Sequence, residues 1–365
     1  PGQVAELLPS PGWIMLAWVV GAAISLAGAV ANAELGAMFP RAGGDYVYLK
    51  EAFHPAAGFL VGWLTFFAIY AGTVAALSAA LAEGVGVRFG WGEGTVRLAG
   101  VAIVGAISIL HLVSLRWGAR ANNLTTVFKI AALAAFVLLG PWVGEGAVER
   151  IFAPAEGEFS VVSFARALSP VLFSYLGWNA CVYVASEIRD PNRNLPRSLF
   201  MGLGLCAVIY LLVNGVYLYA LPMAEFRGIP DAGAAAGEAL FGPVGGALVG
   251  LFVLLSVLGT LNATALVGPR IPYAMALDGL FFSGLDRVHP TRGTPSAAIV
   301  VQGGVAVALL LLLESFPNVL DFTVFAIVLA TLADVMALYP KQFFFFQFFP
   351  TILVTLLYLN YCIIS

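Results

Sequence analysis

The sequence is poor in charge: only 10% of its 365 residues are Asp, Glu, Lys or Arg. Soluble domains carry roughly 25%. Hydrophobic residues make up 61% of the chain, and the mean hydropathy is +0.95. This balance excludes an ordinary soluble domain and predicts an all-α polytopic membrane protein built as one helical bundle.

Cysteine and histidine are also scarce, with three residues of each. The cysteines, Cys181, Cys206 and Cys362, fall within apolar runs, so they are interpreted as small packing residues and not as a disulfide set. The histidines show no metal-ligand spacing, and we expect neither a metal nor a cofactor. The net charge of −3 comes without any basic run, which argues against a nucleic-acid partner.

Common enzyme motifs are missing. The chain has no HExxH, no GxSxG and no phosphate loop of the GxxxxGK type. The GLG at Gly202 to Gly204 lies inside an apolar run with no strand before it. The sequence therefore predicts a protein that is not an enzyme.

Long apolar runs dominate what is present. About ten of them reach about 20 residues, enough to cross a hydrocarbon core of about 30 Å. The predicted spans are 12–39, 57–83, 96–114, 122–143, 164–187, 198–221, 243–267, 296–314, 317–339 and 343–362.

The distribution of Lys and Arg predicts the orientation. If the first span ends inside the cell, eleven of these residues fall in inner loops and five in outer loops and ends. This asymmetry follows the positive-inside rule and places Pro1 outside. With an even number of spans the C-terminus also lies outside, and one further helix before Pro1 would give a cytoplasmic start.

The last stretch differs in composition from the rest. Phe343 to Ser365 contains neither Ala nor Gly, although both are abundant before it. Residues 340–365 are therefore interpreted either as an extra helix or as an artefact of reading frame or splicing.

One stretch interrupts the fifth span with polar and conformationally flexible residues. It places Ser174, Tyr175, Gly177, Trp178 and Asn179 at the depth of the membrane centre. A broken helix is tolerated there only where its backbone is buried in protein or lines a polar cavity, so the break predicts a binding site. The alternative is that Gly177 is a packing notch and the aromatic residues are ordinary core.

Lys129 lies about seven residues beyond the inner end of the fourth span, roughly 10 Å deep. Either its long stem carries the ammonium back to the interface, or the ammonium faces the bundle interior. In the second case it stands where a cation would otherwise bind and is a candidate coupling residue.

Other polar positions are candidates for a cavity or a gate. Tyr70 and Gly72 lie at the centre of the second span, and Asn262 interrupts the seventh. Such groups commonly join helices to one another, but together with the break at Gly177 they are also suited to lining one cavity. Glu34, six residues before Pro40, is either an interface carboxylate or a coupling residue.

Three motifs make the chain resemble a known family. They are ELGAMFPRAGGDYVY at Glu34 to Tyr48, FSYLGWNACVYVASEIRDPNRNLPRSL at Phe173 to Leu199, and RIPYAMALDGL with VHPTRGTP between Arg270 and Pro295. The chain is similar to amino acid permeases of the amino acid–polyamine–organocation superfamily, in particular the bacterial relatives of L-type amino acid transporters. The resemblance covers residues 1–339.

The resemblance implies a fold of two inverted five-helix repeats, in which the first helix of each repeat unwinds at mid-membrane around the substrate. The fifth span would then open the second repeat. The matching helix of the first repeat would precede Pro1, so the resemblance implies an N-terminally truncated chain with family helices two to ten in residues 1–339.

Site residues are carried over from the second family motif. The resemblance assigns the unwound, substrate-binding segment to Phe173, Ser174, Tyr175, Gly177, Trp178 and Asn179. Lys129 matches a lysine that many sodium-independent members place where sodium binds in related transporters. Leu176 departs from members with an acidic residue at that position, which disfavours a cationic substrate.

The resulting expectation is a secondary transporter of neutral L-amino acids in the bacterial plasma (inner) membrane. It would work by alternating access, as a proton-coupled carrier or an exchanger, with amino acid, lipid bilayer and protons as partners. The alternatives are a polyamine or amine permease and a transport-inactive membrane sensor or partner protein.

Overall fold

The structure is a computed structural model that describes residues 1–175, 177–229 and 231–313, with scattered residues between 319 and 336. Within these residues the chain forms helices joined by turns and contains no strand, which confirms the all-α prediction. The elements are α1 (Gly2–Leu7), α2 (Pro11–Met38), α3 (Asp45–Ala52), α4 (Pro55–Leu64), η1 (Thr65–Tyr70), α5 (Ala71–Phe89), α6 (Glu93–Val113), α7 (Leu115–Val143), α8 (Val148–Ile151), α9 (Val161–Tyr175), η2 (Trp178–Glu187), α10 (Pro191–Ala220), α11 (Met223–Phe226), α12 (Ala232–Val267), α13 (Arg270–Leu277) and α14 (Ser296–Leu313).

Seven helical segments in the described part are long and apolar enough to cross a membrane. They are Pro11–Met38, Pro55–Phe89, Glu93–Val113, Arg120–Val143, Pro191–Ala220, Ala232–Leu277 and Ser296–Leu313. These confirm the first four predicted spans and the sixth to eighth. The ninth and tenth, 317–339 and 343–362, lie outside the described residues apart from scattered positions, and segment 340–365 lies wholly outside them.

Helix boundaries follow local capping chemistry. The Ser10 hydroxyl accepts a hydrogen bond from the Trp13 N–H (3.5 Å) and Pro11 occupies the first turn of α2, where its missing N–H is harmless. Ser114 caps α7 in the same way through the Trp117 N–H (3.4 Å). These caps explain why α2 and α7 begin where the apolar runs begin.

The second span contains an irregular turn. Between α4 and α5 the chain winds as a π-helix, η1, which ends at Tyr70. Such insertions are rare in helices and are frequent at functional sites. No residue in the sequence signals it directly, because the run from Pro55 to Phe89 reaches a mean hydropathy of 1.8 and has no proline inside it to mark an irregular turn.

The seventh span is longer than predicted. The small-residue run after Asp231 forms the first arm of α12, and the Asp231 carboxylate caps it by accepting from the Ala234 N–H (2.9 Å). The two arms meet at Gly242, whose φ of +74° breaks the helical path, with Pro243 next to it. The kink divides a short first arm, which buries Ala232, Ala236 and Leu240, from the longer arm that covers the predicted span.

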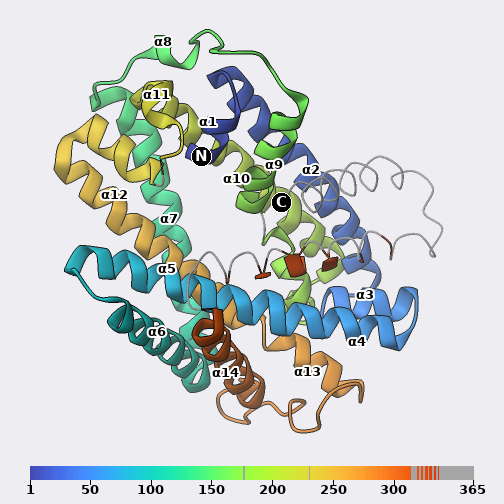
Figure 1. Ribbon diagram of the computed structural model, residues 1–365. Helices are drawn as coiled ribbons and strands as arrows, with labels where there is room; N and C mark the ends of the chain where they lie inside the picture. The colour runs from blue at the N-terminus through green and yellow to red at the C-terminus, as the bar shows by residue number, and fades with distance from the viewer. Residues whose placement is uncertain are drawn as a thin grey trace.

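The helices gather around two buried apolar clusters. The larger cluster joins α2, α9, η2 and α10, and the smaller joins α5, α6, α12 and α14. In Figure 1, α4, η1 and α5 form one long rod across the bundle, with α6 and α14 against its α5 end. Small residues allow the close approaches: a Cβ on Gly21 of α2 would lie 2.4 Å from the Val171 side chain of α9.

Two short helices connect the spans on the side that the charge asymmetry assigns to the inside. Helix α3 lies in the connection between Pro40 and Pro55, and α13 lies in the connection after the seventh span. Figure 1 shows both beside the α4 end of the long rod.

Candidate functional site

The fifth span is broken at the predicted place. Helix α9 ends at Tyr175, Gly177 has the left-handed φ of +94°, and a 3₁₀-helix, η2, runs from Trp178 to Glu187. A Cβ on Gly177 would meet no atom within 4 Å, so the backbone conformation and not crowding favours glycine here. Leu176 and the side chains of Phe173 and Trp178 lie outside the described part of the structure.

Hydrogen bonds from neighbouring helices support the end of α9. The Tyr210 hydroxyl of α10 donates to the Ser174 carbonyl (2.9 Å), and the Tyr175 hydroxyl donates to the Trp18 carbonyl of α2 (3.3 Å). The Ser174 hydroxyl turns back to the Pro170 carbonyl (2.9 Å). A carbonyl near the break is thus satisfied from outside its own helix, as an apolar environment requires.

Three aromatic rings pack beneath the break. The ring of Tyr175 lies 5.0 Å from that of Tyr210 and 6.0 Å from that of Trp18, and the Trp18 and Tyr210 rings are 5.5 Å apart. Tyr175 is 3% exposed, so its side chain supports the break from behind. Asn179 is half-buried and Gly177 is exposed, and these residues lie on the accessible side.

The Lys129 side chain reaches toward α12. Its Nζ donates to the Thr260 Oγ1 at 2.8 Å, and the side chain is half-buried. A Cβ on Gly259 would lie 3.1 Å from the Lys129 Cε, so this glycine lets α7 and α12 approach. No carboxylate pairs with the Lys129 ammonium among the described residues.

The remaining candidates occupy different places. Tyr70 packs edge-on against the Tyr183 ring of η2, with 5.3 Å between ring centroids. The Asn262 side chain donates to the Gly118 carbonyl of α7 (3.1 Å) and joins two helices. A Cβ on Gly72 would lie 2.3 Å from the Thr323 Oγ1, and Glu34 is half-buried on α2.

Sequence reasoning missed several partners. Thr260, Tyr210 and Tyr183 contact candidate residues, and none of them was selected from the sequence. Tyr210 and Thr260 gave a weak signal, because each places a hydroxyl inside an apolar span. Within the described residues, no group of three His, Cys, Asp or Glu side chains is arranged to hold a metal ion.

Comparison with known proteins gives one consistent result. A sequence model described as "Amino acid permease" matches residues 3–362. The serine/threonine exchanger SteT of Bacillus subtilis (strain 168) is 31% identical over 324 residues, which cover 88% of this chain and 73% of that protein.

Animal transporters are similar as well. The b(0,+)-type amino acid transporter 1 of Mus musculus is 28% identical over 84% of this chain and 64% of its own length. The large neutral amino acids transporter small subunit 2 of Rattus norvegicus is 30% identical over 82% of this chain and 58% of its own length. The chain thus spans less than two thirds of these two relatives.

Proposed function

Because this chain belongs to the amino acid permease family, we propose that it is a secondary transporter that moves neutral L-amino acids by alternating access. The family consists of transporters and not enzymes. The family match, the bacterial relative and the seven apolar helices among the described residues make the chain an integral membrane protein of the plasma membrane. Amino acid transport is the activity that the named relatives share.

The observation that carries the proposal is the break between α9 and η2. Near Gly177 the chain leaves α-helical geometry inside an apolar bundle, and a break of this kind is suited to receive a ligand with an ammonium and a carboxylate group. We assign the substrate to this break, lined by Phe173, Ser174, Tyr175, Gly177, Trp178 and Asn179. Tyr175 would act from behind through its contacts with Trp18 and Tyr210.

The proposed substrate is a neutral amino acid. The stretch from Phe173 to Asn179 contains no acidic residue that would pair with a second ammonium group. One of the relatives is a serine/threonine exchanger and another is a large neutral amino acids transporter subunit, which agrees with this assignment.

The proposed coupling residue is Lys129. Its ammonium supplies a fixed positive charge between α7 and α12, where it takes the place of a bound cation. Transport would then proceed by exchange or with protons, and without sodium.

The deciding experiment is counterflow uptake into proteoliposomes that contain the purified full-length protein. Labelled amino acids are added outside against a preloaded unlabelled pool, with protein-free liposomes as the control. We expect saturable uptake that neutral amino acids compete for and that is unchanged when sodium is replaced by choline.

Other outcomes would redirect the proposal. Saturable uptake of polyamines with no amino acid uptake would establish an amine permease. Amino acid binding without any flux would establish a membrane sensor. Dependence of uptake on sodium would overturn the role assigned to Lys129.

A further inference from the structure

The loop before α3 is shaped to receive one side chain of the broken helix. Gly43 and Gly44 have positive φ values of 117° and 51°. A Cβ on Gly44 would lie 2.6 Å from the ring of Tyr183, so any larger residue would collide with it. The two glycines therefore let the chain turn tightly against η2.

Hydrogen bonds fix this contact from both partners. The Tyr183 hydroxyl donates to the Asp45 Oδ2 at the start of α3, and the Gly43 N–H donates to the Tyr183 carbonyl (3.4 Å). Asp45 and Tyr183 are each 2% exposed, which makes these bonds costly to leave unmade. The beginning of α3 is thus attached to the inner half of the broken helix.

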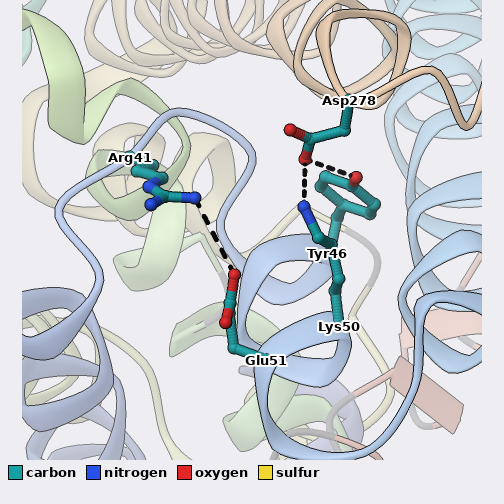
Figure 2. A network of polar contacts seen from close by, with 5 residues as sticks. All are labelled: Arg41, Tyr46, Lys50, Glu51 and Asp278. Carbon is teal, nitrogen blue, oxygen red and sulfur yellow. Dashed lines mark hydrogen bonds and ion pairs between the residues drawn. The ribbon is translucent and has the colours of Figure 1, made fainter.

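The opposite face of α3 is attached to α13. Tyr46 and Lys50, one helical turn apart, both reach Asp278 directly after α13: the Tyr46 hydroxyl donates to Oδ2 at 2.7 Å and the Lys50 Nζ to the same oxygen at 2.6 Å (Figure 2). One carboxylate oxygen of Asp278 therefore accepts hydrogen bonds from a phenol and an ammonium group on the same helix face.

These contacts differ in how easily they separate. The Lys50 and Asp278 side chains are 21% and 34% exposed. Water can therefore hydrate both charged groups when the ion pair separates. The contact between Asp45 and Tyr183 is almost completely buried. Tyr46 is itself 0% exposed, so the part of the Asp278 contact that separates most easily is the ion pair with Lys50.

We propose that α3 is a strap between the inner half of the broken helix and α13, and that release of Asp278 from Tyr46 and Lys50 permits the inner side of the transporter to open. Helix α13 follows α12, and Thr260 of α12 accepts a hydrogen bond from Lys129. The strap therefore connects the broken helix with the helix that contacts Lys129. The inference rests on the proposed function, since only a carrier that opens on two sides needs such a release.

A thiol next to Tyr183 provides the readout. Cys181 lies on η2 and is half-buried, so its alkylation rate reports how often this region opens. The rate is measured with N-ethylmaleimide on the full-length protein in liposomes, in a Cys206→Ser, Cys362→Ser background. The measurement needs no substrate, so it gives an answer even if amino acid uptake is never observed.

Two variants weaken the strap and one controls for it. Asp278→Asn removes the charge that pairs with Lys50, and Tyr46→Phe removes only the hydroxyl. Glu51→Gln is the matched control, because Glu51 lies on the same helix but pairs with the exposed Arg41 at 3.8 Å and not with α13. Figure 2 shows the two pairs side by side.

We expect Asp278→Asn and Tyr46→Phe to raise the alkylation rate of Cys181 by roughly tenfold, the factor for a lost hydrogen bond to a charged group.

The control Glu51→Gln should leave the alkylation rate unchanged. Asp278→Glu keeps the carboxylate, so its alkylation rate should lie close to that of the wild type. A merely structural role would lower the melting temperature of the variants without changing the alkylation rate.

Defined results would overturn the proposal. They are an unchanged rate in Tyr46→Phe with the protein folded, or an equal increase in Glu51→Gln. If uptake fails in the wild type while the alkylation pattern holds, the proposed function falls and the contact between α3 and α13 stands as a conformational switch of another kind.

Discussion

The role proposed for Lys129 depends on the hydrogen-bond acceptor that its ammonium contacts. A lysine in an apolar helix is costly unless its ammonium finds acceptors, and here the Thr260 hydroxyl is the acceptor. Gly259 beside it leaves room for the lysine stem. The sequence left open whether the ammonium returns to the interface or faces the bundle, and the contact across α7 and α12 supports the second interpretation.

Replacing Lys129 by Met tests the coupling role. The substitution keeps the length of the stem and removes the charge, so we expect exchange to fall by about tenfold or more, equivalent to ~1.4 kcal/mol. Counterflow uptake normalised to the amount of inserted protein measures this. Thr126→Val is the control, because the Thr126 hydroxyl only bonds the Asn122 carbonyl of its own helix (2.8 Å). Saturable uptake at the wild-type rate in Lys129→Met would remove the residue from the mechanism.

At the scale of elements, the broken helix and α3 depend on each other. Helix α9 is held by α2 and α10 through Trp18 and Tyr210, while η2 is held by α3 through Asp45. Both halves pack against α2, and α10 contacts both, so the attachment of η2 to α3 through Asp45 is what distinguishes the inner half. The left-handed Gly177 is the point at which the two halves change direction.

The charge state of Asp278 gives the α3 contact a defined pH dependence. Burial raises the pKa of Asp278, but the hydrogen bonds from Lys50 and Tyr46 and the charges of Lys50 and Arg41 outweigh burial and leave the pKa below its ordinary 3.8. Burial and the bond to Asp278 raise the pKa of Tyr46, which keeps its donor proton in place. Because the folded-state pKa of Asp278 is lowered, its stabilising effect is present above the ordinary pKa and is lost as the pH falls through the lowered value.

We therefore expect the difference in melting temperature between wild type and Asp278→Asn to be constant from about pH 5 to about pH 8 and to shrink below about pH 4. Thermal unfolding in detergent at a series of pH values measures it, with Glu51→Gln as the reference variant. A difference that grows on acidification would contradict the assignment of Asp278 as the charged acceptor.

For the whole molecule, the charge asymmetry predicts one orientation. The connections that contain α3 and α13 are expected inside, and the acidic connection that contains α8 is expected outside. All of the mechanism proposed for α3 depends on this, because release at Asp278 opens the inner side only if α3 faces the cytoplasm.

Single cysteines test the orientation in intact cells that express a cysteine-free protein. Ala155→Cys, in the exposed connection after α8, should react with a membrane-impermeant maleimide. Ser283→Cys, in the exposed connection after α13, should react only after permeabilisation. The reverse labelling pattern would mean that the protein has the opposite orientation in the membrane, with α3 on the outer side.

The sequence by itself determined the membrane class, seven of the spans and the break at Gly177, because hydropathy and glycine conformation are local properties. It also located Lys129, Tyr70 and Asn262 as polar points within apolar runs, and their roles in transport stay predictions. It did not indicate the π-helix before Tyr70, because no residue in that run marks an inserted turn.

Only the tertiary structure decided which polar groups meet. Lys129 and Thr260 are 131 residues apart, Asp45 and Tyr183 are 138 apart, and Tyr46 and Asp278 are 232 apart. Each contact depends on how two helices are rotated and how deeply their small residues interlock, which local propensity does not fix. The chain's own pattern places these groups at suitable depths, and helix packing selects their partners.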